Sequence, residues 1–190
     1  LGHPCTRYLY YLRTAWQERA LPSPELQTIF DAGVELEKWT LRRLEEAGFR
    51  IQEQQRAFEW KEYQITGHID AFIAENGSNF YPLEIKHLNQ FDWEKLNSKE
   101  DFLKADKVWL QKYPTQIALY MLMASKENGV LLLVNKQNFQ MKEIWFGLDD
   151  ILTIGETALK KAEAVNKAIK TNIPPPRMPF SEQCLKCDFF

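Results

Sequence analysis

Apolar and polar residues recur along the chain with two periods, and together these predict a mixed α/β protein. Alternation with a period of two, bounded by turn residues, is typical of strands. Strands are expected over residues 51–60, 63–74, 80–87, 129–136 and 140–146. The period of 3.6, together with proline and glycine punctuation, predicts helices. These are expected up to about Leu21, from about Glu25 to Ala47, from about Pro114 to Lys126, and over 148–170.

The stretch Gly67–His87 predicts a β-hairpin with a three-residue Asn-Gly-Ser turn. Directly opposed residues of an antiparallel pair point to the same face, so the apolar positions set the register. This register pairs Ile69, Ala71 and Ile73 with Ile85, Leu83 and Tyr81. On the other face it places Asp70 opposite Glu84 and His68 opposite Lys86.

Asp70 and Glu84, held side by side, repel each other unless a cation lies between them or one of them keeps a proton. A divalent ion such as Mg²⁺ or Mn²⁺, which prefers hard oxygen ligands, meets this need. Lys86 adds a positive point charge on the same face. The alternative is an exposed strand face on which the three side chains form an ion-pair cluster. The residues alone leave both interpretations open.

Asp70 followed by Glu84-Ile85-Lys86 resembles the D…(D/E)xK signature of the PD-(D/E)xK nuclease superfamily, and "GHID" resembles the GxxD form of its RecB-type exonuclease branch. The resemblance implies one α/β domain over 1–190, with a restriction-endonuclease-like core in which helices flank a mixed central sheet. It implies that Asp70, Glu84 and Lys86 are catalytic. It also implies that Asp70, Glu84 and the backbone carbonyl of Ile85 hold Mg²⁺ or Mn²⁺.

A feature upstream extends the resemblance. An apolar stripe at helical spacing consists of Phe30, Val34, Leu41 and Leu44. Glu37 completes this stripe. The RecB-type branch often has GxxxH here, whereas this chain has Gly33 and then Glu37, so Glu37 is expected to replace the histidine as a metal ligand. The alternative is that Glu37 extends its carboxylate to the solvent or pairs with a nearby Arg or Lys. Glu35, on another face, is the weaker candidate.

A feature downstream does the same. Gln116 and Tyr120 lie four residues apart on one face of the expected helix. They resemble the QxxxY motif of the same branch, which implies that the amide and the phenol position the DNA strand. The alternative is an amphipathic helix with Tyr120 at the margin of the core and Gln116 exposed.

Three cysteines remain: Cys5, and Cys184 and Cys187 as a CxxC pair. They resemble the iron-sulfur subgroup of RecB-type nucleases, seen in CRISPR-associated spacer-acquisition exonucleases and AddB-type helicase-nucleases. The resemblance implies a 4Fe-4S cluster with its fourth cysteine outside this sequence. A zinc site that uses His3 and plain reduced cysteines are the alternatives.

Charge and composition narrow the picture. The chain has 190 residues and a formal net charge of −2, so any contact with nucleic acid must be local. No apolar run reaches the length of a membrane span, and we expect an intracellular, cytoplasmic protein. Within the single domain, the N-terminal helix (1–21) and the tail (172–190) are expected to close on each other.

The function implied by the resemblance is metal-dependent hydrolysis of phosphodiester bonds in DNA by an exonuclease acting on single strands or ends. Association with a helicase or other DNA-processing subunits is implied as well. Two alternatives stay open: a DNA-binding module of the same fold that has lost cleavage, and a structure-specific endonuclease.

Overall fold

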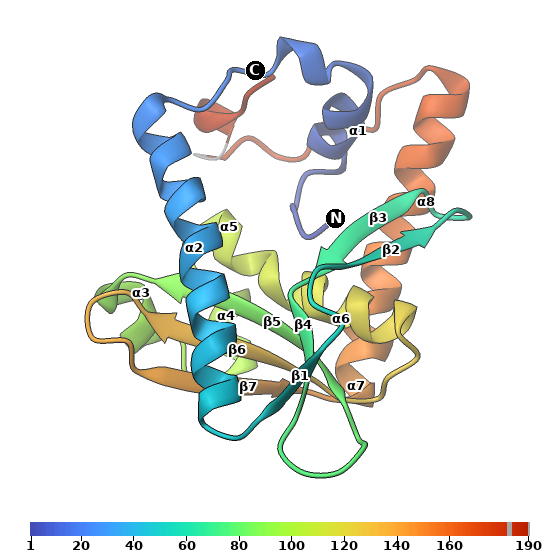
Figure 1. Ribbon diagram of the computed structural model, residues 1–190. Coiled ribbons are helices and arrows are strands. Elements are labelled where there is room, and N and C mark those ends of the chain that lie inside the picture. Colours follow the sequence, from blue (N-terminus) through green and yellow to red (C-terminus); the bar gives the residue numbers. More distant parts are fainter. Residues whose placement is uncertain (182–183, 190) are drawn as a thin grey trace.

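A five-stranded mixed sheet forms the centre of the computed structural model, which describes residues 1–181 and 184–189 (Figure 1). Its strand order is β1-β4-β5-β6-β7. These strands are β1 Arg50–Gln52, β4 Ala71–Ala74, β5 Tyr81–Leu88, β6 Gly129–Asn135 and β7 Met141–Phe146. β5 and β6 run parallel, and the other three pairs are antiparallel. Strands β2 (Arg56–Trp60) and β3 (Ile65–Ile69) form a separate two-stranded sheet.

Helix α2 crosses one face of the central sheet, and helices α3 to α6 lie on the other (Figure 1). The α-helices are α1 Thr6–Thr14, α2 Pro24–Glu46, α3 Gln90–Lys95, α4 Lys99–Leu103, α5 Val108–Gln111, α6 Tyr113–Met123, α7 Leu148–Asp150 and α8 Glu156–Thr171. A π-helical turn, η2 Ile151–Gly155, joins α7 to α8, and the 3₁₀ turns are η1 Trp16–Glu18 and η3 Cys184–Lys186. The Ser23 side chain caps α2 by accepting the Leu26 N–H at 3.2 Å.

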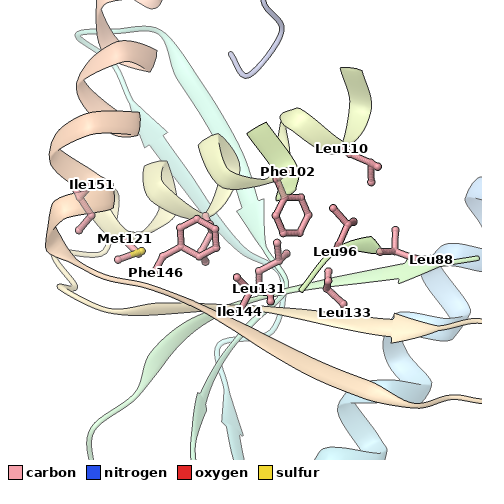
Figure 2. Packing of buried hydrophobic residues seen from close by; sticks show 11 residues of the cluster. Leu88, Leu96, Phe102, Leu110, Met121, Leu131, Leu133, Ile144, Phe146 and Ile151 are labelled. Carbon is pink, nitrogen blue, oxygen red and sulfur yellow. The ribbon is translucent and has the colours of Figure 1, made fainter. Parts of the chain in front are cut away.

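Two hydrophobic clusters fill the spaces on either side of the sheet. The cluster between the sheet and helices α3–α6 contains Leu88, Leu96, Phe102, Leu110, Ile117, Met121, Leu131, Leu133, Ile144, Phe146 and Ile151 (Figure 2). On the other side, Leu41 and Leu44 of α2 pack against Leu83 and Ile85 of β5. Because side chains alternate along a strand, Glu84 between them faces the layer of α3–α6. β5 is therefore covered on both faces.

The hairpin register is confirmed within the ladder, where Ala71 pairs with Leu83 and Ile73 pairs with Tyr81. The connection between the strands spans residues 75–80 and is longer than the expected three-residue turn. The expected extension of the ladder toward His68 is wrong, because the strand bends at residue 70. His68 instead pairs with Ala57 of β2.

Two of the expected strands are each divided in the structure. The region 51–60 becomes β1 and β2, because Glu53 and Gln55 take left-handed φ values of 51° and 54°. The region 63–74 becomes β3 and β4, separated at Asp70. The halves of each region belong to different sheets. The short helices α3, α4 and α5 were not predicted, since segments this short carry no clear helical period.

The apolar stripe predicted on α2 is buried only in its second half. Leu41 and Leu44 belong to the core, whereas Phe30 and Val34 are 52% and 53% exposed. The helix extends beyond the edge of the sheet, so nothing among the described residues buries its first turns (Figure 1). Such a stripe predicts the side of a helix that faces the core, and for Phe30 and Val34 this prediction is wrong.

Segments from the two ends of the chain contact each other. The Tyr8 hydroxyl donates to Asp188 Oδ2 at 2.9 Å, and the Arg7 guanidinium donates to the Pro175 carbonyl at 3.0 Å. Arg19 forms a salt bridge with Asp188 at 3.0 Å. Within the described residues, no helix combines the length and the apolar character that crossing a membrane requires.

Candidate active site

Asp70 lies at the bend between β3 and β4, where the backbone leaves the ladder. Its side chain is 7% exposed, and Oδ2 accepts the backbone N–H of Ile85 on β5 at 2.7 Å. Burial raises the pKa of Asp70, while the positive charge of Lys86 and the hydrogen bond from Ile85 oppose the increase. Asp70 is thus joined to β5 by its carboxylate and not as the ladder partner of Glu84.

Glu84 and Lys86 point from β5 into the layer below α6. The Glu84 side chain is fully buried; Oε1 accepts a hydrogen bond from Lys86 Nζ, and Oε2 has no hydrogen-bond partner among the described residues. Burial raises the pKa of Glu84 to about 8. The interpretation of these residues as an exposed ion-pair cluster is therefore wrong, because helices cover this face.

Lys86 keeps its positive charge in this environment. Burial alone would lower the pKa of Lys86, but the negative charges of Glu84 and Asp70 outweigh burial and raise it. The ammonium also lies 5.1 Å from the centre of the Tyr113 ring, a favourable cation–π distance. The side chain opposite Lys86 is Leu133 of β6, so the expected pairing of Lys86 with His68 is wrong.

Glu37 reaches the same site from α2. Its Oε1 accepts a hydrogen bond from Gln55 Nε2 at 2.6 Å. Burial and the charge of Asp70 raise the pKa of Glu37, whereas the bond from Gln55 lowers it. The expected alternative of an Arg or Lys partner is replaced by this amide. Glu35 instead pairs with Lys38 on the surface at 2.7 Å.

Gln55 is a site residue that the sequence pattern did not reveal. Its left-handed backbone places its N–H 3.1 Å from the Asp70 carbonyl oxygen, while its side chain bonds to Glu37 and also lowers the pKa of Asp70. It therefore connects two of the three carboxylates. The surrounding residues "QEQQR" are uniformly polar and carry no periodic signal that would single out one glutamine.

Tyr120 on α6 is oriented toward the strand that leads to Asp70. Its hydroxyl donates to the His68 carbonyl at 2.6 Å, and Gln116 Nε2 lies 3.5 Å from the same hydroxyl. Tyr120 is only 5% exposed. Gly67 makes this approach possible, because a Cβ at that position would lie 2.9 Å from the hydroxyl oxygen. The phenol thus holds β3, two residues before Asp70.

The carboxylates suit a hard divalent cation. Within the described part of the chain, no three His, Cys, Asp or Glu side chains are arranged as a metal-binding group. One oxygen of Glu84 and one of Glu37 are hydrogen-bonded to Lys86 and Gln55 instead. The buried, unpartnered Oε2 of Glu84 is the atom that a cation would satisfy, so the residue types and their burial fit such an ion.

The cysteines do not form a comparable group among the described residues. All three are free thiols, and no set of three metal-binding side chains includes them. Cys5 Sγ accepts the Tyr8 N–H at 3.4 Å and so caps α1, and His3 Nδ1 accepts the Cys5 N–H at 3.1 Å. The iron-sulfur cluster and the zinc site both remain predictions.

Comparisons with known proteins identify the fold. No protein-family model and no curated protein matches the sequence. The crystal structure of SSO0001 is similar, with a TM-score of 0.53 and 19% sequence identity, and the match covers 99% of this chain and 80% of that chain. The crystal structure of an alkaline exonuclease, LHK-Exo from Laribacter hongkongensis, has a TM-score of 0.51 and 16% sequence identity. This match covers 75% of this chain and 69% of that chain. The structure of LHK-Exo in complex with dAMP has a TM-score of 0.56 and 12% sequence identity, over 88% of this chain and 87% of that chain.

These similarities, all below one-fifth identity, are similarities of fold. The mixed α/β fold with a five-stranded central sheet and flanking helices is of the restriction-endonuclease-like type, as the sequence predicted. One of the neighbours with this fold is an alkaline exonuclease.

Proposed function

We propose that this chain is a metal-dependent DNA nuclease, and that it acts as an exonuclease on single strands or on DNA ends. One observation carries the proposal: a fully buried Glu84 with an unpartnered oxygen lies beside Asp70 and Lys86. Such an arrangement disfavours the metal-free fold, because Glu84 is removed from water and the charge of Asp70 further opposes its ionisation. The fold of this chain is similar to that of an alkaline exonuclease, which has also been solved in complex with dAMP. This similarity supports a reaction on nucleotides.

The residues proposed to hold one or two Mg²⁺ or Mn²⁺ ions are Asp70, Glu84, the Ile85 carbonyl and Glu37. Bound Mg²⁺ or Mn²⁺ would neutralise phosphate charge and make water a stronger nucleophile at neutral pH. The carboxylates supply the negative charge that attracts the ion, and the burial of Asp70 and Glu84 strengthens that attraction.

Lys86 is proposed to act on the reaction itself. It stays protonated because Glu84 and Asp70 raise its pKa. Its ammonium can therefore donate hydrogen bonds to the non-bridging phosphate oxygens as negative charge builds on them. The ion pair with Glu84 and the Tyr113 ring restrict where this ammonium lies, so it requires little reorganisation during the reaction.

Two residues are proposed to position the catalytic carboxylates. Gln55 bonds to Glu37 through its side chain and to the Asp70 backbone through its N–H. Tyr120 fixes the carbonyl of His68 from the opposite side. Together they hold the bend that aims Asp70 at β5, where small displacements change rates strongly.

Cleavage of end-labelled DNA with and without Mn²⁺ tests the proposal. The expected result is release of labelled product from linear and single-stranded DNA only with the metal, and no degradation of closed circles. Glu84→Gln should abolish cleavage, while Glu94→Gln, which changes an exposed glutamate on α3, should retain it. Degradation of circles at the same rate would replace the exonuclease with an endonuclease. Binding of DNA with no cleavage under any metal would indicate a binding module.

A further inference from the structure

A cavity of about 570 Å³ lies on the α8 side of the candidate active site, between α1, β3, α6 and α8. Its walls are largely apolar and include Leu9, Leu12, Ile65, Leu119, Met123 and Val165. The volume falls in the range of roughly 300–1,000 Å³ that is common for small-ligand sites. The proposed cleavage chemistry at Asp70 and Glu84 makes no use of this cavity.

The charged side chains that line the cavity are all cationic. Arg13 and Lys112 line it, and no aspartate or glutamate does, although the chain contains 26 acidic residues. Arg13 donates to the side-chain oxygens of Asn166 and Gln64, which are both neutral. Among the described residues, neither cation takes part in a salt bridge. The cavity therefore favours an anion.

Uncharged polar groups also line the cavity, namely Thr66, Thr115 and Gln116. They provide hydrogen-bond donors and acceptors at the cavity wall, which an alkyl chain could not use. The edge of a nucleobase has donors and acceptors of its own, and its faces are suited to apolar walls. An anion with a flat, hydrogen-bonding body therefore fits the apolar walls, the cationic side chains and the uncharged polar groups of the cavity.

The cavity adjoins the candidate active site through α6. Tyr120 lines the cavity, and its hydroxyl donates to the His68 carbonyl, two residues before Asp70. The charges of Glu84 and Asp70 act on the same phenol. A molecule in the cavity would therefore lie next to the carboxylates, separated from them by Tyr120.

We propose that this cavity binds a deoxynucleoside monophosphate, with the base between the apolar walls and the phosphate beside Arg13 and Lys112. The inference rests on the proposed nuclease function, which supplies such a group in two ways. A mononucleotide is released by exonucleolytic cleavage, and a phosphorylated nucleotide also ends a DNA strand. Both present the same chemistry to the cavity.

The test measures binding in EDTA, where cleavage cannot occur, by following backbone amide resonances during titration. Deoxyadenosine 5′-monophosphate should bind at least tenfold more tightly than deoxyadenosine or inorganic phosphate, and it should shift resonances of Thr66, Thr115 and Leu119. Lys112→Gln should weaken binding about tenfold. The matched variant Lys104→Gln, which changes an exposed lysine outside the cavity, should leave it unchanged.

A second variant, Thr115→Trp, fills the cavity and should abolish binding. If this variant does not fold, the comparison of Lys112→Gln with Lys104→Gln still decides. Equal affinity for phosphate and the monophosphate would overturn the proposal, and so would shifts confined to other regions. Equal weakening by both lysine substitutions would do the same, because it would indicate non-specific attraction.

The proposal for the cavity and the proposal for the nuclease centre can be refuted independently. Glu84→Gln should lose cleavage but bind the monophosphate normally in EDTA. A protein that binds the monophosphate yet never cleaves DNA would refute the nuclease and retain the cavity. Titration with a 5′-phosphorylated tetranucleotide and its 5′-hydroxyl form identifies the source. A preference for the phosphorylated form assigns the cavity to strand ends, and binding of the mononucleotide alone assigns it to the product.

Discussion

Replacing Tyr120 with phenylalanine separates two roles that the phenol can have. The resemblance to QxxxY implies contact with DNA, whereas the structure places the hydroxyl 2.6 Å from the His68 carbonyl in a side chain that is 5% exposed. Phenylalanine keeps the ring and removes only the hydroxyl. The substitution therefore tests the hydrogen bond without opening a cavity.

The expected loss of stability follows from this contact. The substitution removes one buried hydrogen bond and leaves the His68 carbonyl without that donor, which costs about 1–3 kcal/mol. The contact with Gln116, at 3.5 Å, is at the limit of a hydrogen bond and adds little. We expect the free energy of unfolding to fall by about 1–2 kcal/mol, and the melting temperature to fall by roughly 2–4 °C for each kcal/mol.

The effect on cleavage should differ from that of a lost DNA contact. Looser anchoring of β3 displaces Asp70, so kcat should fall about tenfold or more while KM for DNA changes little. Urea unfolding without metal and Mn²⁺-dependent cleavage kinetics measure the two effects. Tyr81→Phe is the control, because its hydroxyl bonds only to the exposed side chain of Asn79 in the structure described. It should change stability by less than about 0.5 kcal/mol.

The opposite pattern would refute this reasoning. A Tyr120→Phe variant with unchanged stability and a raised KM would show that the phenol contacts DNA, as the resemblance implies. A variant unchanged in both properties would show that the hydrogen bond to His68 is of no consequence. Only a joint loss of stability and kcat agrees with a positioning role.

Four further outcomes are expected. Lys86→Met should lower the cleavage rate about 100-fold or more with the fold retained by circular dichroism. Mn²⁺ should raise the melting temperature of the parent and of Glu94→Gln but not of Glu84→Gln, measured by calorimetry. Burial lowers the pKa of His87 from 6.5 to about 4. Between these two pH values, His87 is protonated in the unfolded chain but not in the folded protein. The free energy of unfolding should therefore fall by ~2 kcal/mol from pH 7 to pH 4.5, a value reduced for the partial exposure of His87. Urea unfolding at the two pH values measures this loss, which His87→Asn should remove. Anaerobically purified protein should contain iron that Cys187→Ala removes, and bound zinc with no iron would favour the alternative site.

The sequence predicted the hairpin register because pairing Ala71 and Ile73 with apolar residues of the second strand also brings the charged residues together on the other face. It did not predict the bend at Asp70. That bend depends on Gln55, whose left-handed backbone lies fifteen residues earlier in a uniformly polar segment. Long-range contacts of this kind leave no trace in local periodicity, so the strands were expected to continue where the structure divides them.

Periodicity also identifies a face without identifying what covers it. On α2, the same stripe contains Leu41, which is buried against the sheet, and Phe30, which lies beyond the sheet edge. On β5, Glu84 alternates with apolar residues, and alternation alone is compatible with exposure of its face. The helices that bury Glu84 come from residues 90–123, whose first part gave no helical signal. The chemistry of the site was therefore easier to predict than its burial.

That burial explains how one arrangement can be unfavourable for the fold and useful for function. Removing Glu84 from water raises its pKa to about 8, and the charges of Asp70 and Glu37 contribute to the increase. A well-packed apolar group at this position would stabilise the metal-free fold better than a buried ion pair does. The same loss of water strengthens every interaction between these carboxylates and an added positive charge. A cation bound at Oε2 of Glu84, which has no hydrogen-bond partner among the described residues, would therefore stabilise the folded protein most where burial of the carboxylate is most unfavourable. For this reason, Mn²⁺ should stabilise the parent protein and not Glu84→Gln.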